Sequence, residues 1–395
     1  MEAFINTVSS QSVYIDGIDA RCTIIRIAMC YWYENSAREL WTTFMPPDTL
    51  MHAFFRTLQE FPLLAGHLKA DSDSHMYVKV DKDNLNMPAY TDRTCPLDYS
   101  VLKDSGFNIH RLPFSLADEY GVPAPSGMVD IQIKQAFIRI LRFNNQSGIL
   151  VFASIAHCLV DGYGFTHFMN RWAEVSRWMQ RPEGIARDPL PVRQYIHDRS
   201  IHASYRTSET TALDVFELGS MATSSPFIRW LSWISPEARG WLFKAISLAS
   251  DRTCCYFHIP AKAIQDIRLS VQQHAPPDTR FSTNDIITAL VTIVIAQAKE
   301  KALVDWWNRP LPSFVRTIFG KETGKSTTDF LTSIAVNIRP RIGNPDAKNY
   351  MGSMVLGKNV MTPQDQVNLE PTSEALAMVA LRINKAISAT DDRFA

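Results

Sequence analysis

The stretch that decides the fold runs from Ile149 to Gly164 and is ILVFASIAHCLVDGYG. Its first eight residues, up to Ala156, are nearly all apolar, which predicts a strand that is covered on both faces. His157 follows the strand directly, Asp161 comes four residues later, and Gly162 permits the tight turn that must follow. An imidazole at the end of a rigid strand, with a carboxylate nearby, has what a general base needs.

Other interpretations of this H-x-x-x-D-G pattern stay open. A short motif also arises by chance, and His157 could be a strand-end histidine followed by a solvated aspartate and a turn glycine. Asp161 could orient the imidazole or form a structural ion pair that holds the turn. A metal site at these two residues lacks a third ligand with suitable spacing. Cys158 is expected to be structural, because side chains at a strand end alternate in direction.

Outward from this stretch, hydrophobic periodicity and turn residues predict strands interleaved with helices, the mark of an α/β fold. Asp48 is the expected cap of the first helix, and Ser282 with Asp285 has capping-box spacing. The expected helices are Asp48–Leu58, Phe165–Met179, segments within Ser224–Ser250, Ile286–Ala298 and Glu374–Ile387. The expected strands lie within Val129–Phe143, Ile149–Ala156, Cys255–Ile259 and Ile334–Ile338, with a turn at Asn144–Gly148.

Length and composition narrow the class of protein. A chain of 395 residues favours two domains, and hydrophobic residues at 46% with charged residues at 20% are typical of a globular protein. Forty basic residues balance forty acidic ones, which argues against nucleic acid or an anionic membrane as partner. Residues 1–11 lack the features of a secretory signal, and Ile286–Ala298 is too short to span a bilayer. The six cysteines lack C-x-x-C spacing, so we expect reduced thiols and a cytoplasmic protein.

Several further segments carry a family resemblance by their order along the chain. They are Phe61-Pro62-Leu63-Leu64-Ala65-Gly66-His67-Leu68, the His157–Gly162 motif with Phe168–Ala173 after it, His197-Asp198-Arg199-Ser200, Phe281–Asp285 with Ala289-Leu290, Val336–Arg341, and Asn349-Tyr350-Met351-Gly352. Together they resemble the plant and fungal BAHD acyltransferases, members of the chloramphenicol-acetyltransferase-like superfamily. The resemblance runs from near the N-terminus to about residue 387.

The resemblance implies two α/β domains with an active-site channel between them. The expected boundaries are residues 1–180 for the N-terminal domain, 181–210 for a crossover linker, and 211–395 for the C-terminal domain. Acyl-CoA would enter as co-substrate from one side and a small-molecule acceptor from the other, in a monomer with no bound cofactor. No acyl-enzyme is implied, and the sequence does not identify the donors to the oxyanion.

The resemblance also assigns roles to individual residues. His157 would take a proton from an acceptor hydroxyl or amine, while Asp161 would point away from the channel and pair with Arg339. Gly162 and Gly164 would leave room and flexibility for the turn. Ser282 and Thr283 would lie near the CoA site, although an ordinary helix cap explains them as well.

Two departures from the family pattern matter. Ala156 stands where the related peptide-synthetase condensation domains carry a second histidine, which favours the BAHD interpretation. The family's D-F-G-W-G motif is absent, so we expect the second domain to be incomplete. The alternatives are a non-catalytic, truncated family member that acts as a binding protein, and a condensation-like domain that uses a carrier-protein thioester. Trp306 and Trp307 could line the acceptor pocket or pack a domain surface.

Overall fold

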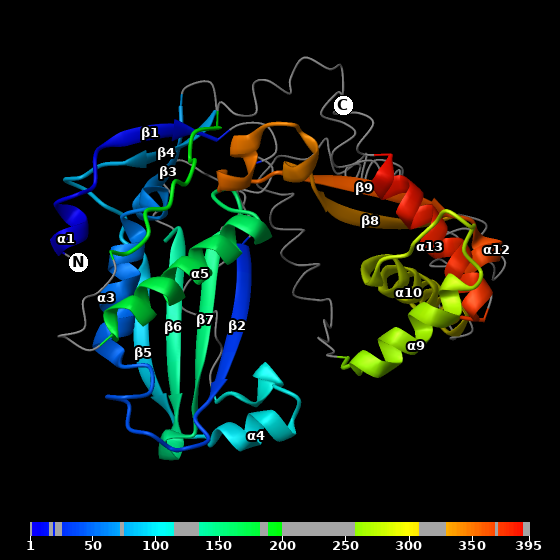
Figure 1. Ribbon diagram of the computed structural model, residues 1–395, viewed down its shortest axis with the longest axis horizontal. Coiled ribbons are helices and arrows are strands. Elements are labelled where there is room, and N and C mark those ends of the chain that lie inside the picture. The colour runs from blue at the N-terminus through cyan, green and yellow to red at the C-terminus, as the bar shows by residue number, and fades with distance from the viewer. Residues whose placement is uncertain are drawn as a thin grey trace. The chain divides into compact units, whose positions relative to one another are not determined.

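The computed structural model describes residues 2–15, 19, 26–71, 75–113, 134–181, 189–199, 257–307, 329–367 and 370–389. These residues form two compact units (Figure 1). Among them, residues 2–199 and Asn344–Val355 belong to unit 1, and residues 257–343 and 356–389 belong to unit 2. Alternating strands and helices confirm the α/β class. The domain boundaries at residues 180 and 210 stay a prediction.

The main sheet of unit 1 has the order β2-β7-β6-β5. Its two central strands, β6 and β7, are antiparallel and joined by a short turn, while β5 pairs with β6 in parallel. The four strands are β2 (Arg26–Glu34), β5 (Ala89–Cys95), β6 (Ala136–Phe143) and β7 (Gly148–Ala156). Every residue of β6 and β7 is buried, which confirms the expectation of a strand covered on both faces.

The two faces of β7 pack into different cores, because successive side chains of a strand point to opposite sides. Ile149, Val151, Ala153 and Ile155 join a core formed with α3 (Pro47–Leu58) and α5 (Gly162–Met179). Leu150 and Phe152 join a second core with α4 (Tyr99–Asp104). A strand with cover on both sides has no polar face, so its sequence shows no alternation.

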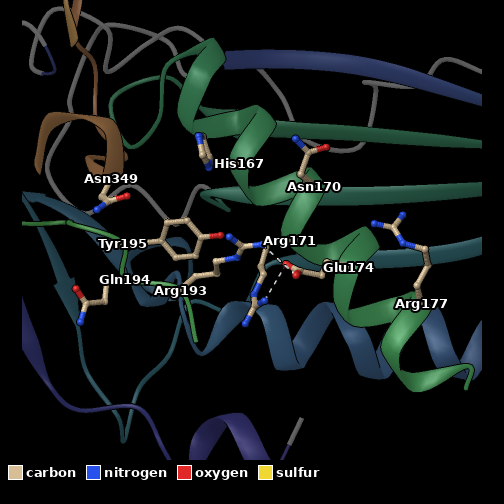
Figure 2. A pocket seen from close by; sticks show the side chains of 9 residues that line it. All are labelled: His167, Asn170, Arg171, Glu174, Arg177, Arg193, Gln194, Tyr195 and Asn349. Carbon is tan, nitrogen blue, oxygen red and sulfur yellow. Dashed lines mark hydrogen bonds and ion pairs between the residues drawn. The ribbon is translucent and has the colours of Figure 1, made fainter. Parts of the chain in front are cut away.

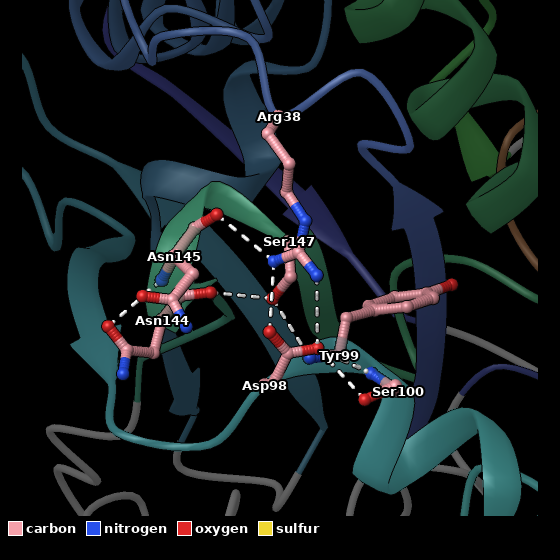
Figure 3. Close-up of polar contacts among 7 residues, drawn as sticks. All are labelled: Arg38, Asp98, Tyr99, Ser100, Asn144, Asn145 and Ser147. Atoms are coloured by element: carbon pink, nitrogen blue, oxygen red, sulfur yellow. Dashed lines mark hydrogen bonds and ion pairs between the residues drawn. The ribbon is translucent and has the colours of Figure 1, made fainter.

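A polar cluster holds the turn between β6 and β7 (Figure 3). The turn is the 3-10 segment Asn144–Gln146, and Asn145 adopts a left-handed conformation with φ of 53°. Ser147 donates its hydroxyl hydrogen to the Asn144 carbonyl (2.7 Å) and accepts from the backbone N–H of Tyr99 (2.9 Å). Arg38 donates both to Asp98 (2.9 Å) and to the Asn145 carbonyl (3.0 Å). The expected turn is therefore confirmed.

The remaining elements of unit 1 include a small antiparallel sheet of order β1-β4-β3. They are α1 (Glu2–Ile5), β1 (Gln11–Tyr14), the 3-10 segment Pro62–Ala65, β3 (His67–Ala70), β4 (Met76–Val80), and the 3-10 segments Ile109–Arg111 and Pro345–Asn349. The first helix ends at Leu58 as expected, and a 3-10 turn and then β3 follow it.

The core of the described part of unit 2 is formed by apolar residues of α9, α10 and α13 together with β8 and β9. Its elements are α9 (Ala261–Gln272), α10 (Thr283–Trp307), β8 (Phe330–Asn337), the 3-10 segment Arg339–Arg341, β9 (Val355–Thr362), α12 (Gln364–Val367) and α13 (Ser373–Ser388). The helices expected after Ser282 and Glu374 and the strand expected near Ile334 are confirmed. None of the helices in the described ranges is long and apolar enough to cross a membrane.

Three expectations have other outcomes. Asp48 does not cap α3: the cap position is Pro46, no side chain caps it, and Asp48 lies in the first turn. Proline suits the start of a helix because its ring sets φ and the missing N–H would have no partner there. Residues 257–259 form no strand, although Cys255–Ile259 was expected to; residues 255 and 256 lie outside the described ranges. The helices expected in Ser224–Ser250 lie outside them as well.

Phe168 tests the packing of α5 against α3 and the segment that follows it. Its ring is fully buried and meets Phe61 and Phe54 edge to face, with centroid distances of 5.1 and 6.1 Å. Phe168→Ala should lower the free energy of unfolding by about 3–5 kcal/mol, measured by denaturant titration. Leu40→Ala, at a side chain that is 62% exposed, should cost far less. Equal losses in the two variants would contradict this account of the core.

Candidate functional site

His157 lies where the central strand of unit 1 ends. It follows Ala156, the last residue of β7, and a turn begins there with the Leu159 N–H bonded to the Ala156 carbonyl (3.0 Å). The imidazole is half-buried, and its Nδ1 atom is buried with no hydrogen-bond partner among the described residues. The expected placement of His157 at the end of a buried strand is confirmed.

Asp161 joins the start of α5 to a distant segment. Its carboxylate is fully buried and accepts from the N–H of Gly164 (2.9 Å), which makes it the N-cap of the helix. The other oxygen accepts from the N–H of Met354 (3.1 Å), 193 residues further along the chain. Negative charge at a helix N-terminus is favourable, because the first N–H groups have no partner within the helix. Asp161 therefore fixes where α5 begins.

The two glycines after Asp161 play different parts. A Cβ at Gly164 would stand 2.3 Å from the carbonyl oxygen of Met351, so the backbone can approach only because this residue is glycine. A Cβ at Gly162 would meet nothing within 4 Å, and Gly162 has no left-handed φ. Of the two glycines expected to leave room for the turn, Gly164 meets a steric requirement and Gly162 does not.

A buried arginine binds the turn that follows His157. Arg199 Nη2 donates to the carbonyl oxygens of Leu159 (3.0 Å) and Cys158 (3.4 Å). Its Nη1 donates to the hydroxyl of Tyr350 (2.8 Å) and lies 3.3 Å from an oxygen of Asp19. The Tyr350 hydroxyl in turn donates to Asp19 (2.9 Å). All three side chains of this Arg199–Asp19–Tyr350 cluster are buried.

The protonation states in the cluster follow from burial and charge. Burial alone would lower the pKa of Arg199, but Asp19 and Tyr350 outweigh it and the pKa of Arg199 is raised. Burial also raises the pKa of the Tyr350 phenol, so this hydroxyl keeps its proton and can donate to Asp19. The cluster is therefore an ion pair bridged by a neutral hydroxyl.

Chain segments that are distant in sequence meet at this cluster. Ile196 forms a parallel bridge with Tyr350: the Ile196 N–H bonds to the Asn349 carbonyl (2.8 Å), and the Met351 N–H bonds to the Ile196 carbonyl (3.0 Å). Nearby, His197 packs against Phe61 and donates through Nε2 to the Glu60 carbonyl (2.7 Å). Burial lowers the pKa of His197 to about 4, so it is neutral near pH 7. It is a structural histidine.

Cys158 is fully buried. A buried thiol does not meet a substrate, which agrees with the expectation that Cys158 is structural. In the described part of the chain, no three histidine, cysteine, aspartate or glutamate side chains cluster as ligands of a metal would.

The other predicted site residues belong to unit 2. Arg339 is buried and donates from its backbone N–H and from Nη1 to the Asn337 side chain (3.1 and 3.3 Å). Because Asp161 belongs to unit 1, the Asp161–Arg339 ion pair stays a prediction. Ser282 and Asp285 form the expected capping box, with reciprocal hydrogen bonds of 2.8 and 3.1 Å. Thr283 is the first residue of α10, and the side chains of Trp306 and Trp307 lie outside the description.

A polar cavity of about 410 Å³ lies beside α5 and does not include His157 in its lining (Figure 2). Residues of α5, the segment 193–195 and Asn349 line it. Its most buried charge, Arg171, is already bound by Glu60 (2.6 Å) and Glu174 (2.8 Å). None of the residues assigned to acyl transfer faces this cavity.

The sequence does not indicate how the site is supported. Arg199 and Tyr350 belong to short segments of the chain, and nothing in those segments indicates that the two side chains bind each other. Asp19 lies outside any motif, and a single aspartate carries no pattern. The parallel bridge at Ile196 joins residues more than 150 positions apart, which no local pattern predicts.

At the level of sequence, the chain has a partial likeness to one curated protein. No family model matches the chain. A protein of Penicillium crustosum named enoyl-CoA isomerase/hydratase claC is 27% identical over 266 residues, which are 65% of this chain and 27% of that protein. The chain thus spans about a quarter of the length of this curated relative.

Two solved structures resemble this one over most of both chains. F. sporotrichioides TRI101, complexed with coenzyme A and T-2, has a TM-score of 0.55 at 13% identity and covers 97% of this chain and 75% of its own. The first condensation domain of the CDA synthetase has a TM-score of 0.56 at 13% identity, covering 98% and 76%. These likenesses confirm the expected fold, which TRI101 and the condensation domain share. They do not distinguish between those two classes.

The contrast between the two glycines can be tested directly. Gly164→Ala should lower the free energy of unfolding by about 1–3 kcal/mol, because the new methyl group must displace the Met351 backbone. Gly162→Ala should stay within about 1 kcal/mol of the wild type or gain slightly, since alanine restricts the unfolded chain. Thermal melting of both variants measures this. A larger loss at residue 162 than at residue 164 would refute it.

Asp161→Ala removes a helix cap and leaves the buried N–H of Met354 without its partner. We expect a loss of about 2–4 kcal/mol in unfolding free energy, with turnover falling alongside. Thr372→Ala, which removes the single cap bond of α13, is the matched control and should cost about 1 kcal/mol. If Asp161→Ala melts normally yet is inactive, Asp161 takes part in catalysis directly.

Proposed function

We propose that this chain transfers an acyl group from acyl-CoA to a hydroxyl or amine of a small-molecule acceptor, with His157 as the general base. The observation that carries the proposal is the support of His157: an imidazole at the end of a fully buried central strand, on a turn whose next residues are bound by buried side chains. A general base must be held in one geometry, and this arrangement supplies that rigidity.

In the proposed reaction, His157 takes the proton of the acceptor hydroxyl or amine as the acceptor attacks the thioester carbonyl. The tetrahedral intermediate then collapses, the carbon–sulfur bond breaks, and the imidazolium returns the proton to the departing CoA thiolate. Because Nδ1 is buried, we infer that Nε2 receives the proton. Nδ1 then carries the hydrogen in the resting imidazole, since only one ring nitrogen can accept. The buried Cys158 takes no part.

Two kinds of support combine here. The ordered segments around His157 resemble the BAHD acyltransferases, and the fold is that of TRI101, whose structure holds coenzyme A and T-2. By the same resemblance, Ser282 and Thr283 at the start of α10 would approach the CoA. The enoyl-CoA isomerase/hydratase name belongs to a protein that this chain matches over 27% of its length, so that activity is not carried over.

Asp161 and Arg339 are proposed to form an ion pair that links the catalytic turn to the second unit. A double-mutant cycle with Asp161→Asn and Arg339→Met tests it, because residues in contact show a coupling energy beyond the sum of the single effects. A cytoplasmic, monomeric protein stays a prediction from the sequence.

There are two alternatives to this function. The likeness to a condensation domain favours a carrier-protein thioester as donor, while Ala156 before His157 argues for acyl-CoA. The second alternative is a non-catalytic protein of this fold that binds CoA without turnover. A panel of acyl-CoAs tested against alcohols and amines, with the release of free thiol as the readout, distinguishes these alternatives from the proposed function. Turnover with acyl-CoA supports the proposal, whereas CoA binding without turnover by any pair favours the binding protein.

His157→Ala should lower kcat by about a hundred- to ten-thousand-fold, the range for loss of a positioned base. The affinity for CoA, measured by calorimetry, should change little, because the imidazole meets the acceptor proton rather than the nucleotide. His75→Ala, at an exposed histidine of unit 1, is the control and should keep wild-type turnover. Near-wild-type turnover of His157→Ala would falsify the assignment of the base.

A further inference from the structure

Arg199 makes contacts that concern the catalytic turn in particular. Both carbonyls that it binds belong to the two residues directly after His157. Carbonyl groups in a buried turn need donors, and the guanidinium offers them in a planar, fixed arrangement. The orientation of these two peptide groups helps to set the backbone from which the His157 side chain projects.

The guanidinium itself is held on its other side. Asp19 neutralises it at 3.3 Å, and Asp19 is fixed in turn by the Tyr350 hydroxyl (2.9 Å) and the Ser353 N–H (2.7 Å). Gly352 makes room: a Cβ there would stand 1.5 Å from Arg199 Nη1. A buried guanidinium held through Nη1 and Nη2 by several partners has few low-energy positions, because a displacement would break these contacts.

We propose that Arg199 is a positioning residue that fixes the turn after His157 and so aims the imidazole, with Asp19 and Tyr350 holding the guanidinium in place. The proposal rests on His157 as the base. This role differs from a purely structural one. A structural arginine would stabilise unit 1 without affecting His157, whereas a positioning residue also sets the orientation of the imidazole.

Arg199→Lys tests the proposal. Lysine keeps the charge beside Asp19 but is a single point donor, so it cannot bind the two turn carbonyls and Tyr350 together. With acetyl-CoA and the best acceptor of the screen, kcat should fall about 10- to 100-fold, the effect of a small misplacement of a catalytic group. The KM for acetyl-CoA should stay within about twofold, because the ground-state binding is not affected.

The matched control is Arg142→Lys. Arg142 is also a buried arginine, bound to the Asp92 carboxylate (2.8 Å) and the Met45 carbonyl (3.0 Å), but it lies in β6 and does not contact the turn. Its replacement should lower the melting temperature as Arg199→Lys does and leave kcat unchanged. If both variants lose stability and both keep kcat, Arg199 is only structural and the proposal is wrong.

A second arm uses the His157→Ala background. If Arg199 acts through His157, adding Arg199→Lys to His157→Ala should reduce the residual turnover no further, because residues that act as a unit are not additive. A further loss of the full single-mutant size would contradict the proposal. If Arg199→Lys does not fold, Tyr350→Phe replaces it, since it removes only the bridging hydroxyl and should shift kcat in the same direction.

A third arm needs no substrate. In protein labelled with nitrogen-15 histidine, the ring resonances of His157 are assigned by their loss in His157→Ala. They should shift in Arg199→Lys and stay in place in Arg142→Lys. If His157→Ala keeps wild-type turnover, the proposed function fails, and this measurement still decides the positioning role: unshifted His157 resonances in Arg199→Lys overturn it.

Discussion

The carboxylate of Asp161 is the constraint on which the rest of the candidate site depends. One oxygen caps α5 and the other accepts from Met354, so one side chain determines where the helix begins and where the segment 350–354 lies. Gly164 allows this close approach, and the carbonyl of Met351 occupies the space that a side chain would fill. The turn that begins at His157 is therefore held at its other end, Asp161, by α5 and by the segment 350–354.

Buried charges are costly unless all their hydrogen bonds are made, and the two at this turn are extensively paired. Asp161 faces backbone N–H groups, whereas Arg199 faces carbonyl oxygens, a carboxylate and a phenol. The residues from Cys158 to Asp161 are buried. Arg199 binds the carbonyls at one end of this segment, and the Asp161 carboxylate binds backbone N–H groups at the other. His157 stands at the start of this bound segment and is only partly buried. A fixed backbone with a half-exposed imidazole suits proton transfer.

The glycine of the H-x-x-x-D-G pattern is not the glycine at which the backbone makes its close contact. In the H-x-x-x-D-G pattern the glycine is Gly162, yet the space around it is open and its φ is not left-handed. The close contact falls on Gly164, two residues later. A pattern of residue types reports what recurs in a family, while the clash of a single Cβ depends on which backbone passes nearby. Only the tertiary structure identifies Met351 as that backbone.

The sequence by itself determined the α/β class, the buried strand Ile149–Ala156, the helix after it and the placement of His157, because these follow from local periodicity and turn residues. The capping box of Ser282 and Asp285 belongs to the same group. Only the tertiary structure decided that Arg199 binds the turn after His157, and that Asp19 and Tyr350 hold Arg199. These contacts join residues that are tens to hundreds of positions apart. They depend on how buried groups satisfy one another in three dimensions, and no pattern along the chain records that.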